Sequence, residues 1–168
     1  MTAPDILLLG DPRLHETSVP VTREELHTVP RIAQELHDAI LSYRARYGAG
    51  RAIAAPQLGI RKRIIHMFID EPLTLINPVL DRKSRDMIEL WDDCMSFPGL
   101  LVRVKRHRRC RLTYRDTSWR EHSYTIENDL SELLQHECDH LDGILAVARA
   151  IDGRSFRLTG RVDSLPER

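Results

Sequence analysis

The sequence of 168 residues lacks the features typical of secreted, membrane-spanning and polyanion-binding proteins. Its three cysteines, Cys94, Cys110 and Cys138, are odd in number and far apart, unlike a secreted disulfide framework. No apolar run approaches the roughly 20 residues that cross a bilayer, and residues 6–9 are too short for the core of a signal peptide. Lys+Arg and Asp+Glu both number 25, so the basic excess of a bulk nucleic-acid binder is absent. We therefore expect a cytoplasmic protein with no membrane partner.

The length and the apolar content predict one folded domain over residues 1–168. Domains usually contain roughly 100–200 residues, and 42% of this chain is hydrophobic, which disfavours disorder. No repeat, low-complexity tract or Gly/Ser-rich linker divides it. Residues from about 149 to 168 contain Gly153, Gly160 and Pro166 and no sustained apolar stripe, so we expect a short tail there without a helix.

Hydrophobic periodicity predicts two helices separated by strands. The first helix covers about 30–47, with Thr28 as its cap and Gly48 at its end. The second begins near 128 or 129, where Asp129 and Glu132 have capping-box spacing. The strand-like runs are 64–69, 73–76, 100–102, 110–114 and 123–126. Strands followed by a late buried helix favour an α+β fold.

The second predicted helix contains His136-Glu137-Cys138-Asp139-His140. Residues four apart lie on one helix face, so His136 and His140 can bind one metal ion. Glu137 would then lie beside the open coordination position and could accept a proton from bound water. A chance pattern on a charged helix is the alternative, which the apolar stripe of this helix disfavours.

A catalytic metal site needs a third protein ligand, and nothing suitable follows the histidines. Cys94 is the best upstream candidate because it lies in a turn-rich stretch, 91–99, where a thiolate could project from a fixed backbone. A conventional zinc protease is disfavoured because its third ligand would lie downstream.

The segment 50–57 joins small residues to a proline and to Gln57. Such a segment lets the backbone approach a ligand, and the Gln57 amide could polarise a carbonyl. Taken alone, it is more typical of a tight loop with a surface glutamine.

Together these segments resemble the peptide deformylases. The motifs Gly-x-x-x-Ala-Ala-Pro-Gln, Asp-x-Cys-Met-Ser and Gln-His-Glu-x-Asp-His occur in the family's order, and the resemblance covers roughly residues 5–150. It implies antiparallel or mixed sheets packed around a central metal-binding helix. It also implies a hydrolase that removes the N-formyl group from the N-terminal methionine of newly made polypeptides.

The resemblance also implies roles for individual residues. Cys94, His136 and His140 would bind one divalent ion, usually Fe²⁺, although Zn²⁺, Ni²⁺ or Co²⁺ can occupy such a site. Glu137 would act as general base and acid, and Gln57 with the backbone N–H of Met95 would stabilise the oxyanion. The peptide would lie along the backbone near residue 50, and the implied substrate-binding residues are Gly50, Arg51, Ala52, Asp93 and Leu133.

The chain departs from the family pattern at Arg51, Ala52, Asp93 and Glu132, all on the substrate side. Formamide hydrolysis is therefore better supported than the identity of the substrate. One alternative is the same chemistry on a different N-formyl compound. Another is an inactive, metal-stabilised homologue that binds RNA or the ribosome.

Residues 103–115 hold seven Lys/Arg and no acid. This basic segment could contact ribosomal or other RNA phosphates. The alternative is an exposed face of one or two strands, favoured because no aromatic residue, of the kind that stacks single-stranded bases, interleaves with the cations of 103–111.

Overall fold

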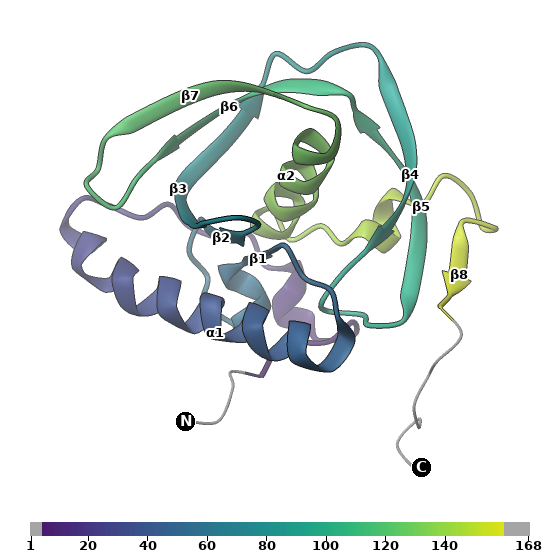
Figure 1. The fold of residues 1–168 in the computed structure, drawn as a ribbon, viewed down its shortest axis with the longest axis horizontal. Helices are drawn as coiled ribbons and strands as arrows, with labels where there is room; N and C mark the ends of the chain where they lie inside the picture. Colours follow the sequence, from purple (N-terminus) through teal and green to yellow (C-terminus); the bar gives the residue numbers. More distant parts are fainter. Residues whose placement is uncertain (1–4, 160–168) are drawn as a thin grey trace.

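Two antiparallel sheets enclose a central helix in the computed structural model, which describes residues 5–159 (Figure 1). The larger sheet has the order β1-β2-β3-β6-β7 and the smaller has β4-β5-β8. The strands are β1 (Ala52–Ala54), β2 (Ile64–Phe68), β3 (Pro72–Asp81), β4 (Met87–Asp93), β5 (Leu100–His107), β6 (Arg109–Arg115), β7 (Glu121–Glu127) and β8 (Phe156–Leu158). The long helices are α1 (Val29–Tyr47) and α2 (Asn128–Leu141). Short 3-10 helices cover Pro12–His15, Glu24–Thr28, Ala55–Leu58 and Ala146–Arg149. The α+β prediction is confirmed.

Helix α1 packs its apolar stripe against the larger sheet. Ile32, Leu36 and Ile40 are buried at helical spacing, as predicted. The helix ends at Gly48, whose φ of 70° is left-handed. Thr28 is the N-cap residue, as predicted, but its side chain does not cap the helix: its hydroxyl donates to the carbonyl of Glu25 within the preceding 3-10 helix.

Strand β3 does not stop at Asn77-Pro78, where the sequence predicts a boundary. Asn77 adopts a φ of 51°, and the pairing with β6 shifts register between Ile76 and Val79, so a bulge carries the strand onward. The Asn77 side chain holds this bulge because it accepts a hydrogen bond from the Val21 N–H and donates one to the Val21 carbonyl, both at 2.8 Å.

Helix α2 lies between the two sheets and packs against β1, β3 and β7 on one side and β5 on the other (Figure 1). Its start corrects the capping-box prediction: the N-cap residue is Glu127, with extended backbone and no capping side chain. Glu132, predicted to close the box with Asp129, instead bonds to Arg51. A tertiary ion pair therefore replaces a local cap.

The end of the chain is described only in part. Within residues 150–159 the structure places β8, a strand that the sequence did not predict. The remainder of the predicted tail, 160–168, lies outside the described residues, so the single-domain and tail predictions stay predictions. None of the helices in the described part is both long and apolar enough to cross a membrane.

Candidate metal centre and active-site cavity

The side chains of Cys94, His136 and His140 converge at the centre of the molecule. Their ligand atoms all lie within 4.8 Å of one another, and all three residues are buried. The Nε2 atom of His140 lies 3.2 Å from both the Cys94 sulfur and the His136 Nε2. Two successive turns of α2 present the histidines on one face, and the end of β4 brings Cys94 to that face.

This donor set fits a transition-metal ion. A thiolate and two imidazoles are ligands that such ions prefer, and three protein ligands leave a fourth position open. The two Nε2 atoms face each other, and a neutral imidazole presents a lone pair on one ring nitrogen, which can bind a cation. A cation at the centre would satisfy both nitrogens and the sulfur at once.

His136 is held from behind by a buried chain of charges. Its Nδ1 contacts Oδ2 of Asp92 at 2.9 Å, and Arg106 donates to that oxygen at 3.0 Å. Burial alone would raise the pKa of Asp92, but His136 and Arg106 lower it below its ordinary value. Asp92 is therefore charged, and it fixes the ring with Nε2 toward the other donors.

Glu137 adjoins the donors without being one of them. Its side chain is 3% exposed, and its Oε2 has no hydrogen-bond partner in the described part of the chain. Burial raises the pKa of Glu137 to about 7. The residue lines a cavity of about 210 Å³ that also borders Cys94 and His136. A carboxyl group with a pKa near neutrality thus lies beside the predicted metal position.

Gln57 is 1% exposed, so the expectation of a surface glutamine from its segment alone is wrong. Its carbonyl oxygen accepts from the Ala54 N–H at 2.9 Å. Its amide nitrogen donates to the Ser96 hydroxyl at 3.1 Å and lies 3.7 Å from the Cys94 sulfur. The donor end of the amide is thereby oriented toward the cavity that Gln57 and Met95 both line.

The predicted substrate-binding residues line the same cavity: Gly50, Arg51, Ala52, Asp93 and Leu133. Gly50 has a φ of 121°, which favours glycine, and Arg44 from α1 donates to its carbonyl at 2.7 Å. Arg51 and Glu132, both departures from the family pattern, form an ion pair at 2.6 Å in the cavity wall.

Comparisons with known proteins agree with this geometry. The family model described as "Polypeptide deformylase" matches residues 3–155. The chain belongs to the peptide deformylase family. It is 31% identical to "Peptide deformylase 1" of Prochlorococcus marinus over 98% of this chain and 89% of that one. It is 34% identical to "Peptide deformylase-like" of Brucella melitensis over 98% and 99%.

Solved structures of peptide deformylases share the fold. The enzyme of Synechococcus elongatus in complex with actinonin has a TM-score of 0.82 and 30% identity, over 90% of this chain and 81% of that one. The Thermotoga maritima enzyme also gives 0.82, with 27% identity over 90% and 100%. The chain is therefore a deformylase-type hydrolase of a metal-dependent family, and it carries a Cys/His/His site suited to a metal ion.

The buried charged residues that hold His136 of the deformylase site in place were not identified from the sequence. Arg106 belongs to the basic segment interpreted as an exposed strand face, yet its side chain is 4% exposed and bridges Asp92 and Asp139. A signal was present, because residues two apart on a strand share a face. Val102 and Val104 therefore predict that Arg106 points into the core.

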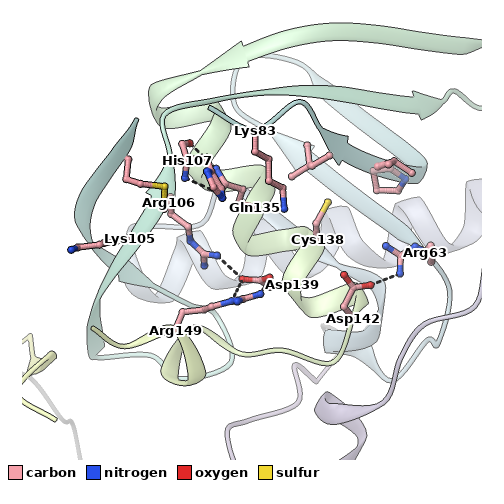
Figure 2. A pocket seen from close by; sticks show the side chains of 14 residues that line it. Arg63, Lys83, Lys105, Arg106, His107, Gln135, Cys138, Asp139, Asp142 and Arg149 are labelled. Carbon is pink, nitrogen blue, oxygen red and sulfur yellow. Dashed lines mark hydrogen bonds and ion pairs between the residues drawn. The ribbon is translucent and has the colours of Figure 1, made fainter. Parts of the chain in front are cut away.

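A second cavity, of about 380 Å³, lies on another side of α2 (Figure 2). Figure 2 shows Arg106 and Arg149 reaching Asp139, while Arg63 pairs with Asp142. Cys138 lines this cavity and lies outside the donor group. Burial raises the pKa of its thiol to about 12, which leaves it protonated and unreactive.

Proposed function

We propose that Cys94, His136 and His140 bind one divalent ion, Fe²⁺ in first place with Zn²⁺, Ni²⁺ or Co²⁺ as alternatives, and that Glu137 transfers the protons of deformylation. The reaction itself, removal of the N-formyl group from the N-terminal methionine of new polypeptides, is that of the family to which the chain belongs. The observation that carries the proposal is the unpartnered, buried carboxylate oxygen of Glu137 beside three convergent donor atoms.

Glu137 is suited to transfer protons near neutral pH. A general base is most efficient when its pKa lies near the working pH, and burial raises the pKa of Glu137 to about 7. When bound, the ion lowers the pKa of a coordinated water and polarises the formyl oxygen. Glu137 accepts a proton from this water at its Oε2, which is unpartnered in the described part of the chain, and returns the proton to the departing amine nitrogen.

Gln57 and the backbone N–H of Met95 stabilise the negative charge that develops on the formyl oxygen. Preorganised donors are effective because they need no reorientation during the reaction. Gln57 meets this condition, since its carbonyl is held by Ala54 and its nitrogen by Ser96. Met95 is buried, follows Cys94 directly and lines the same cavity, which supports this role for its N–H.

The peptide binds along β1 as an added strand. β1 is an edge strand, paired on one side with β2, and its residues border the cavity. An unpaired strand edge offers main-chain donors and acceptors to an extended peptide. In this proposal Gly50, Arg51, Ala52, Asp93 and Leu133 contact the substrate. We place the protein in the cytoplasm, where nascent chains are made.

Contact with the ribosome or other RNA is a further prediction from the basic segment 103–115. Six of its seven cations form ion pairs with carboxylates, and in the described part of the chain Lys105 forms none. Paired cations neutralise few phosphates, because each must first lose its carboxylate partner. This supports an architectural role for the segment over RNA contact, and a salt-dependent gel-shift with ribosomal RNA tests it.

Formate release from an N-formylmethionyl tripeptide by iron-loaded protein tests the main proposal. We expect turnover in the wild type and a loss of roughly 10²–10⁴-fold in Glu137→Gln, with metal content unchanged. The matched control is Glu121→Gln, an exposed glutamate of β7, which should keep full activity. Absence of turnover in wild type with one ion bound would refute the proposal, and equal activity of Glu137→Gln would refute the role of Glu137.

A further inference from the structure

An ion pair forms part of the wall beside the reaction centre. Nη2 of Arg51 lies 2.6 Å from Oε1 of Glu132, and both residues line the cavity that holds Cys94, His136 and Glu137. The Glu132 side chain is 10% exposed and that of Arg51 44%. Taking charged groups out of water is unfavourable unless they are paired. Because each charge here has its partner, this part of the wall is polar.

Nothing else in the described fold uses the Glu132 carboxylate. It does not cap α2, and its bond to Arg51 is its only hydrogen bond among the described residues. Its second oxygen can therefore accept a hydrogen bond from a ligand. Arg51 has five N–H donors and gives one of them to Glu132. The wall thus offers a free donor and a free acceptor side by side.

The first side chain of a bound formyl peptide reaches this pair. Glu132 precedes His136 by four residues and shares its helix face, about 6 Å away along α2. In the proposed function the formyl carbon lies beside Glu137, which lines the same cavity as the pair, and the side chain of the first residue branches only two atoms beyond that carbon. Leu133 and Met95 supply apolar contacts for the aliphatic part of that side chain.

We propose that the Arg51–Glu132 pair makes this deformylase accept N-formyl peptides whose first side chain is polar and uncharged, alongside methionine. This inference rests on the proposed function. A carboxamide matches the pair best: its oxygen accepts from Arg51 and its NH₂ donates to Glu132. An apolar side chain of equal length covers both charged groups without replacing their hydrogen bonds to water, which is unfavourable. Arg51 and Glu132 are therefore specificity-determining residues.

The test compares kcat/KM for three tripeptides that differ only in the first residue: N-formyl-methionine, N-formyl-norleucine and N-formyl-glutamine. We expect the wild type to use the glutamine peptide within about tenfold of the norleucine peptide. The double variant Arg51→Ile/Glu132→Ile removes the pair without leaving one buried charge, and its preference for norleucine over glutamine should rise by at least roughly tenfold. Arg31→Ile/Glu35→Ile, which removes an exposed pair on α1, should leave the ratio unchanged.

Two results would overturn the inference while leaving the proposed function intact. The first is a wild type that already prefers norleucine over glutamine by about a hundredfold, a measurement that needs no variant to fold. The second is a double variant that hydrolyses the methionine peptide with an unchanged norleucine-to-glutamine ratio. If the wild type releases formate from none of the three peptides, the proposed function fails and takes this inference with it.

Discussion

The Nδ1 atom of His136 lies 2.9 Å from Oδ2 of Asp92, and neither side chain is more than 6% exposed. This contact sets which nitrogen of the ring faces the other two donors. Partners of this kind orient a ligand and raise its basicity, so they affect metal binding without touching the metal.

The substitution Asp92→Asn should weaken metal binding by roughly 10–100-fold. The amide keeps the size of the carboxylate but removes the charge opposite His136 and Arg106. Competition with a chelator of known affinity measures the change. Asp93→Asn, the exposed neighbour in β4, is the matched control and should bind metal as the wild type does. An affinity unaltered by Asp92→Asn would show that the ring needs no such partner.

Gln57→Leu should lower kcat by about 10²–10³-fold, the usual cost of removing one oxyanion donor. Leucine fills similar space but lacks the amide held by Ala54 and Ser96. Metal content per chain should stay the same, because the amide nitrogen is not among the convergent donors. Gln34→Leu, on α1, is the control for the chemical change. A rise in KM with kcat preserved would assign Gln57 to substrate binding alone.

Gly143 and Gly48 have nearly equal φ angles, 72° and 70°, but different surroundings. Each Gly→Ala change should cost about 1–2 kcal/mol of unfolding free energy from the left-handed backbone. At Gly143 the added Cβ would also overlap the main-chain carbonyl of His15, whereas at Gly48 nothing lies within 4 Å. We therefore expect a further loss of about 1–3 kcal/mol for Gly143→Ala. Urea denaturation of both variants measures the difference, and equal losses would show that the His15 segment moves aside freely.

The buried His66 predicts a loss of stability in mild acid. Burial, with His37 beside it, lowers the pKa of His66 to about 4, and its ring contacts Thr74 and His37. In the unfolded chain a histidine has a pKa of about 6.5. Below that pH the unfolded state therefore binds more protons than the folded state. The contribution of His66, up to about 3 kcal/mol, is complete above pH 6.5 and declines toward pH 4.

Urea denaturation between pH 4 and 7 measures this effect in the wild type and in His66→Gln. The neutral amide can still bond Thr74, so the variant should show a flatter profile across that range. His27→Gln, an exposed histidine, should reproduce the slope of the wild type. Parallel profiles for the wild type and His66→Gln would contradict the prediction.

Local patterns predicted both long helices and strands within β2, β3, β5, β6 and β7, but not β1, β4 or β8. The i, i+4 spacing of His136 and His140 depends only on helix geometry, and the apolar stripe identified the helix that carries them. The prediction that Cys94 is the third ligand came from the lack of a downstream ligand and from the family resemblance. The structure brings the three together, and their roles stay proposals.

Contacts between distant segments could not be predicted in this way. The capping box expected at Asp129 with Glu132 was wrong, since a cap pattern does not reveal that Arg51, 81 residues from Glu132, lies within reach. The Asp92–Arg106 contact depends on the register between β4 and β5, which is set by tertiary packing.

The donor atoms are far apart along the chain. Cys94 and His140 are separated by 46 residues, a span that includes β5, β6 and β7. An ion held by both would act as a cross-link that closes this loop, and such clips stabilise by restricting the unfolded chain. Because the unfolded chain cannot present all three donors together, the melting temperature would rise with metal concentration, by the equivalent of about 2.7 kcal/mol at a hundredfold excess over Kd. Metal supply would thus affect how stably this protein stays folded as well as how fast it catalyses its reaction.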